Sequence, residues 1–88
     1  MTDMIILDYH PFDQNSIVTI IKDGERSEIP TYSITTTLSQ TLVRLAHEQN
    51  INHLFIHAPT LFFNEMNQLI QEEEHNLYSE NTIITEIC

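Results

Sequence analysis

The sequence of 88 residues predicts an α/β fold, in which five strands form one mixed sheet and two helices lie on one face of it. Three observations support this prediction. Four short runs are rich in apolar and β-branched residues, which is typical of strands. Two longer segments repeat apolar residues at helical spacing. The single glycine, Gly24, follows Asp23, and this pair favours a tight turn between two strands.

The first part of the chain is predicted to form three strands. Met4–Asp8 is a continuous apolar run, typical of a strand that is buried on both faces. Ser16–Lys22 is also apolar on both faces, and Asp23-Gly24 suits a two-residue type I′ turn after it. Glu25–Tyr32 is then the return strand. Pro30 places this strand at the edge of the sheet, because proline cannot donate a hydrogen bond to a neighbouring strand.

The rest of the chain alternates helices and strands. The predicted elements are a helix from Thr35–Thr37 to about Gln49, a strand at Asn52–His57, a helix that Thr60 caps, and a last strand at Thr82–Ile87. Threonine and serine hydroxyls often cap helices, so one of the residues Thr35–Thr37 is expected to cap the first helix, with Ser33 as the second candidate.

The order β-β-β-α-β-α-β limits the sheet to few arrangements. Crossovers between parallel strands are right-handed in about 98% of cases. With strands numbered along the chain, the simplest order is then 3-2-1-4-5, with strands 1, 4 and 5 parallel. Both crossovers move the same way across the sheet, so both helices are expected on the same face. Residues 1–88 therefore form one small acidic domain.

The other face of this sheet has no predicted cover, although the strands are apolar on both sides. A sheet with one face in water should alternate apolar and polar residues, and these strands do not. An apolar surface of this size usually marks an interface. We therefore expect a homodimer or a docked partner there, unless a terminal segment bends over the face or a strand is misassigned. The predicted interface residues are Met4, Ile6, Val18, Ile20, Phe55 and Ile83.

The charge of the chain is strongly acidic. Three basic residues face thirteen acidic ones, giving a net charge of −10, and residues 51–88 contain no Lys or Arg. This balance disfavours direct binding to nucleic acids and to anionic membranes. A basic protein partner and simple solubility both remain as explanations. The predicted acidic surface consists of Glu65, Glu72, Glu73, Glu74 and Glu80.

The sequence also bears on location and cofactors. The single cysteine, Cys88, allows no intramolecular disulfide, and no segment has the pattern of a signal peptide or a membrane span. We therefore expect a soluble cytoplasmic protein. No phosphate-binding or dinucleotide-binding motif is present, so no cofactor is expected.

A polar cluster follows the first predicted strand. The stretch "LDYHPFD" holds Asp8, His10 and Asp13, and His57 ends the strand predicted to lie beside it. Ligands gather beyond the carboxyl ends of parallel strands, so these four residues are candidates for acid–base catalysis. Asp8, His10 and His57 are the candidate metal ligands within the cluster. The alternative is a polar turn that only ends the strand.

The element order resembles the ribonuclease H-like fold, which nucleases, resolvases and actin-like ATPases share. The resemblance covers nearly the whole chain and implies a magnesium-binding aspartate on the first strand, a position that Asp8 in "IILDYHP" matches. The acid expected at the end of the fourth strand is replaced by His57. The first helix lacks an acid in its opening turns, since Glu48 comes too late, and the further acid-bearing helix is absent. One glycine cannot supply the phosphate-binding turns of the actin-like branch.

Together these observations favour a small non-enzymatic protein–protein interaction module that acts as a homodimer or on a basic partner. Its size and charge are typical of a phage- or plasmid-type accessory or inhibitor protein. The alternative function is that of a minimal metal-dependent nuclease or phosphoesterase that uses Asp8, His10, Asp13 and His57. A structural subunit without a regulated partner is the third interpretation.

Overall fold

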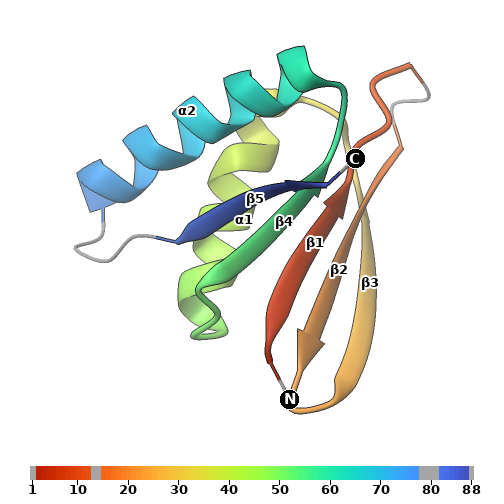
Figure 1. Ribbon diagram of the computed structural model, residues 1–88, viewed down its shortest axis with the longest axis vertical. Coiled ribbons are helices and arrows are strands. Elements are labelled where there is room, and N and C mark those ends of the chain that lie inside the picture. The colour runs from red at the N-terminus through yellow and green to blue at the C-terminus, as the bar shows by residue number, and fades with distance from the viewer. Residues whose placement is uncertain (1, 13–14, 78–81, 88) are drawn as a thin grey trace.

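The computed structural model describes residues 2–12, 15–77 and 82–87. Its elements are β1 (Met4–Asp8), β2 (Ser16–Lys22), β3 (Glu25–Thr31), α1 (Thr35–Glu48), β4 (His53–His57), α2 (Thr60–Leu77) and β5 (Ile83–Ile87). The strands form one sheet in the order β3-β2-β1-β4-β5, in which β1, β4 and β5 are parallel and β2 is antiparallel to both of its neighbours (Figure 1). The predicted fold class and strand order are therefore confirmed.

Both helices pack against the same face of the sheet (Figure 1). Alternate residues of the strands point towards them, because successive side chains of a strand point to opposite faces. The strands contribute Ile5, Leu7, Val18, Ile20, Leu54 and Ile56 to this core, and the helices contribute Leu38, Leu42, Val43, Ala46, Met66 and Ile70. The hydrophobic core thus lies entirely between the helices and one side of the sheet.

Three residues with positive φ make the tight connections. Asp23 (φ 54°) and Gly24 (φ 82°) form the predicted two-residue turn between β2 and β3, and positive φ at both positions is the mark of type I′. Asn50 (φ 55°) ends α1 in the left-handed conformation. The N–H of Ile51 then donates to the carbonyl of Ala46 at 2.8 Å, which completes a Schellman motif and turns the chain towards β4.

The predicted helix caps were wrong. Ile34 is the N-cap of α1 and makes no side-chain capping bond. The hydroxyl of Ser33 instead donates to the carbonyl of His10, and Thr60 is already the first residue of α2, where its hydroxyl donates to Glu86. These hydroxyls therefore join separate elements instead of closing a helix end.

In the described part of the chain, no helix is both long and apolar enough to cross a membrane.

Glu74 was predicted to lie on the acidic surface, and this prediction was wrong. Its side chain is buried, with a residue exposure of 1%. Its carboxylate accepts hydrogen bonds from the backbone N–H of Thr82 at 3.0 Å and from the Thr82 hydroxyl at 2.9 Å, and it lies 3.1 Å from Nε2 of His47. A buried carboxylate is retained only when its oxygens have such partners. Glu74 therefore ties α1, α2 and the start of β5 together.

We expect Glu74→Ala to lower the free energy of unfolding by about 3 kcal/mol, because it removes the buried carboxylate that accepts the N–H and the hydroxyl of Thr82. The matched control is Glu72→Ala on the exposed side of the same helix, which should change stability by less than about 0.5 kcal/mol. Urea denaturation monitored by circular dichroism measures both values. Equal losses in the two variants would contradict the structural role of Glu74.

Candidate functional site

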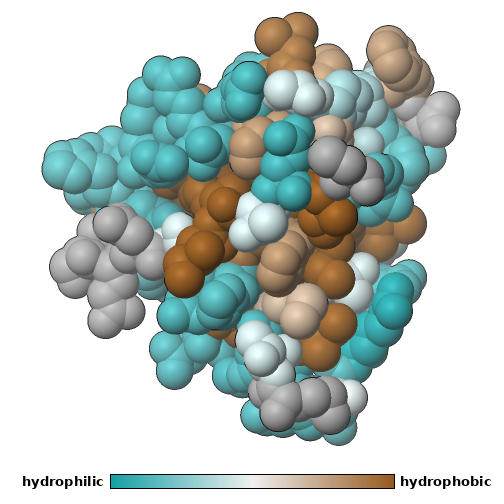
Figure 2. Space-filling view, viewed as in Figure 1, coloured by the Kyte–Doolittle hydropathy of each residue, from teal (hydrophilic) through white to brown (hydrophobic). Residues whose placement is uncertain are grey.

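The face of the sheet that carries no helix, which we call the open face, is largely apolar. The strand register places on it the side chains of Met4, Ile6, Ile17, Ile21, Phe55, Ile83 and Ile87. Ile83 is 53% exposed and Ile17 is 36% exposed. Figure 2 shows apolar side chains gathered over the middle of this face, with hydrophilic residues around them. The register also directs Thr19, His53, His57 and Thr85 to this face. The open face is therefore an apolar surface interrupted by polar side chains and in contact with solvent.

Charge is scarce on the open face. Among the described acidic residues, the register directs only Asp8 and Glu28 towards it, and Arg26 lies beside Glu28. The guanidinium of Arg26 and the carboxylate of Glu28 are 3.2 Å apart, so this pair is neutral in sum. The acidic residues of the helices lie on the opposite side of the sheet. A protein with a net charge of −10 thus has one nearly neutral face.

Four of the six predicted interface residues lie on the open face: Met4, Ile6, Phe55 and Ile83. The placement of Val18 and Ile20 was wrong, since they are 1% and 8% exposed and belong to the core. Val18 pairs with Leu7, so the two side chains share the helix-covered face.

Ile17 and Ile21 take the places on the open face that were expected for Val18 and Ile20. Ser16–Lys22 is apolar on both sides, and the loop before it is too long to fix the strand register. The sequence therefore carried no signal that distinguished its two faces.

The predicted polar cluster comes together at one end of the open face. Asp8 and His57 are neighbours in the parallel β1–β4 pair. One carboxylate oxygen of Asp8 lies 3.1 Å from Nδ1 of His57, and the other lies 3.1 Å from Nε2 of His10. Asp13, the fourth predicted member, lies outside the described residues. A single carboxylate is thus held between two imidazole rings.

Serine hydroxyls that were predicted only as caps or strand residues hold His10 in place. The hydroxyl of Ser16 accepts a hydrogen bond from the backbone N–H of His10 at 3.2 Å, and the hydroxyl of Ser33 donates to its carbonyl at 3.0 Å. The two hydroxyls are 2.7 Å apart. Beside them, the ring of Tyr9 packs on Phe62, with 5.2 Å between the centroids. Nothing in the local sequence of either serine indicates this network.

The imidazoles lower the pKa of Asp8. Partial burial on its own would raise the pKa of this carboxyl. Hydrogen bonds from His57 and His10, with the attraction of these rings, outweigh that effect and bring the pKa below the ordinary value of 3.8. The cluster therefore stabilises a carboxylate anion.

A hollow of about 430 Å³ lies beside the cluster. Its walls include Asp8, His10, His57, Thr60, Glu86 and Ile87. Both oxygens of the Asp8 carboxylate already have imidazole partners. Within residues 2–12, 15–77 and 82–87, no group of three or more His, Cys, Asp or Glu side chains is arranged to hold a metal ion. The arrangement therefore favours a hydrogen-bonded cluster over a metal centre.

The remaining acidic residues predicted for the surface differ in their roles. Glu72 is exposed on α2, and Glu73 beside it is partly exposed. Glu65 accepts a hydrogen bond from the hydroxyl of Thr35 at 3.0 Å, which links the first turn of α1 to α2. Glu80 lies outside the described residues. Glu65, Glu72 and Glu73 therefore lie at the surface as predicted, and among the described members of this set only Glu74 does not.

The chain matches no protein-family model, and none of the curated proteins matches it significantly.

We expect the carboxyl group of Asp8 to titrate below 3.8 in the folded protein. Because folding lowers this pKa, the contribution to stability is present above 3.8 and is lost as the pH falls through the lower folded value. The side chain is 45% exposed, so solvent screening keeps this contribution below about 1 kcal/mol.

Carbon-13 NMR of the carboxyl group measures the midpoint. His57→Ala should raise it towards the ordinary value, whereas His53→Ala, at the other end of the same strand, should leave it unchanged. An unshifted midpoint in His57→Ala would show that this imidazole does not act on Asp8.

Proposed function

We propose that this protein is a small non-enzymatic protein–protein interaction module that works as a homodimer through its open face. The observation that carries the proposal is the apolar, nearly neutral surface of an otherwise strongly acidic protein. A basic partner would need carboxylates on the surface that it contacts, and the open face presents few of them, so a basic partner does not fit this face. A second copy of the same face offers matching apolar side chains, and few like charges would repel each other between the two copies.

The size of the open face supports a dimer. The molecule measures 32 × 29 × 21 Å, and Figures 1 and 2 look along the shortest axis onto the open face, with α2 extending beyond the sheet. A standard stable interface covers about 800 Å² on each partner, so a dimer of this kind would use the whole face. Two-fold pairing is the simplest arrangement, because a single self-complementary patch then covers itself. In such a dimer the partner's sheet replaces the missing helical layer.

The proposed module suits a reducing cytoplasm, because its single cysteine offers no intramolecular disulfide. Its size and charge fit an accessory or inhibitor protein of a phage or plasmid. In this role the dimer would present its two acidic helical layers outwards, where they steer basic targets towards it.

We expect the wild-type chain to sediment as a dimer at micromolar concentration. Phe55→Glu places a charge in the middle of the open face and should weaken the dimer by at least about 100-fold, which corresponds to about 2.7 kcal/mol. The matched control is Leu61→Glu, which makes the same kind of change at an exposed position of α2. Sedimentation equilibrium measures the association, and circular dichroism checks the fold of each variant. A wild-type monomer at micromolar concentration would overturn the proposal.

A metal-dependent nuclease or phosphoesterase is the second candidate, and the convergence of Asp8, His10 and His57 is the observation in its favour. Only one carboxylate is present in the described cluster, whereas Mg²⁺ prefers several oxygen ligands. We expect dialysed protein to retain no stoichiometric Zn²⁺ or Mn²⁺ in elemental analysis. Stoichiometric metal that disappears in Asp8→Ala would favour the enzyme over the interaction module.

A further inference from the structure

The two edges of the sheet differ in how they are protected. An exposed edge strand offers unpaired N–H and C=O groups to another chain, and natural proteins block such edges with proline and charged residues. The edge strand β3 carries Pro30 together with Glu25, Arg26 and Glu28. The opposite edge strand, β5, has the sequence "IITEI", without proline and with a single charge. In the described part of the chain, β5 pairs only with β4.

The direction of the free groups on β5 follows from its pairing. The N–H of Ile83 donates to the carbonyl of Asn52 at 2.8 Å, so this residue points its backbone groups towards β4. Backbone groups alternate in direction along a strand. Ile84 and Glu86 therefore point their N–H and C=O groups away from the sheet. The outward N–H of Thr82 is already bound by the carboxylate of Glu74, which marks the start of the free edge.

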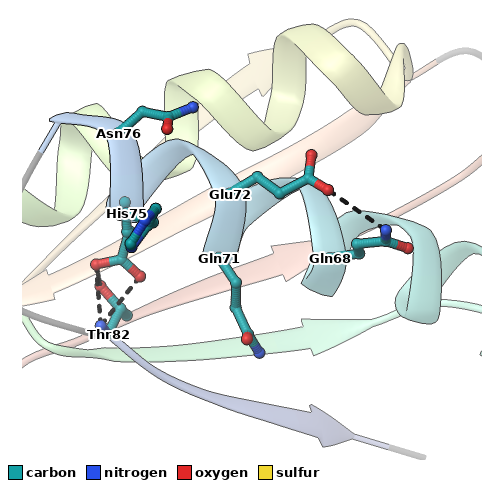
Figure 3. Close-up of a pocket in the computed structure, with 7 residues that line it drawn as sticks. Gln68, Gln71, Glu72, His75, Asn76 and Thr82 are labelled. Carbon is teal, nitrogen blue, oxygen red and sulfur yellow. Dashed lines mark hydrogen bonds between the residues drawn. The ribbon is translucent and has the colours of Figure 1, made fainter.

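A groove lies between α2 and the start of β5. Its volume is about 680 Å³, and its walls include Gln68, Gln71, Glu72 and Thr82. Figure 3 shows Gln71 pointing from α2 towards the sheet, and Glu72 leaving the helix on its other side beside Gln68. Gln68 donates to Glu72 at 3.3 Å, so the wall presents both amide and carboxylate groups. Amide side chains can donate to and accept from the backbone of a bound peptide.

The negative charge around the groove indicates which kind of peptide could bind there. Glu72 lines the groove, Glu86 lies on β5 with its carboxylate bound to the hydroxyl of Thr60, and residues 51–88 contain no Lys or Arg. Two copies paired through β5 would bring these carboxylates together, which opposes self-association at this edge. A peptide with basic side chains would meet them favourably.

We propose that the free edge of β5 and the adjoining groove bind an extended basic peptide, which adds to the sheet as a sixth strand. Backbone hydrogen bonds to Ile84 and Glu86 hold the peptide, and the carboxylate of Glu72 in the adjoining groove favours Lys or Arg side chains. This edge lies apart from the centre of the open face, so the proposal does not rest on the homodimer.

The test uses a fluorescent peptide of about eight residues that alternates Lys and Val, a common length for a strand. We expect binding by fluorescence anisotropy and slower amide hydrogen exchange at Ile84 and Glu86, by at least about tenfold. Glu72→Lys should weaken binding by at least about tenfold. The matched control is Glu48→Lys, an equal change of charge at an exposed position of α1 that does not line the groove, and it should have a much smaller effect.

Two control peptides separate strand addition from simple attraction of charges. A peptide with Glu in place of Lys should not bind. A peptide that keeps its lysines but is N-methylated at alternate residues loses backbone donors and should bind at least about tenfold more weakly. Equal binding of the methylated peptide would overturn the proposal. Concentration-dependent protection of Ile84 and Glu86 without peptide in the Phe55→Glu variant, whose open face should no longer pair, would also overturn it, because a second copy would then occupy the edge.

Discussion

Both helices of this fold lie on one face of the sheet, and the sheet carries apolar side chains on both faces. The covered face holds the whole core, including Ile5, Leu7 and Leu54. The open face keeps Ile6 and Phe55 in contact with solvent. This exposure of apolar surface to water is unfavourable in free energy, and burial against another surface would remove it. The topology creates this imbalance, because both crossovers move in the same direction and bring both helices to the same side. The proposed dimer depends on this imbalance between the two faces.

The distribution of charge complements this imbalance. The acidic residues of the helices lie away from the open face and keep the outer surface well hydrated. On the open face, Arg26 neutralises Glu28, and Asp8 is held by two imidazoles. The polar groups at the margin are thus paired with one another, which lowers the cost of removing them from water. A surface of this kind combines an apolar centre with satisfied polar groups at its rim, as stable interfaces do.

The sequence predicted the elements, the strand order and the meeting of Asp8 with His57, because these follow from hydrophobic patterns, turn residues and the handedness of crossovers. It did not predict which face of β2 is covered, since Val18 and Ile17 are equally apolar and a long loop precedes the strand. It also could not reveal that Glu74 is buried. A glutamate in an acidic run looks like a solvated residue until the tertiary structure brings His47 and Thr82 to it.

The tie between Glu74 and Thr82 also governs how the structure can come apart. The last strand is held by its pairing with β4 and by this carboxylate, so its release would expose β4 as a new edge. That strand carries Phe55 on one side and Ile56 on the other, without proline or lysine to block further pairing. Such a strand is a template for aggregation. By holding β5 in place, the buried carboxylate of Glu74 therefore also keeps β4 from becoming an exposed edge that could pair with another chain.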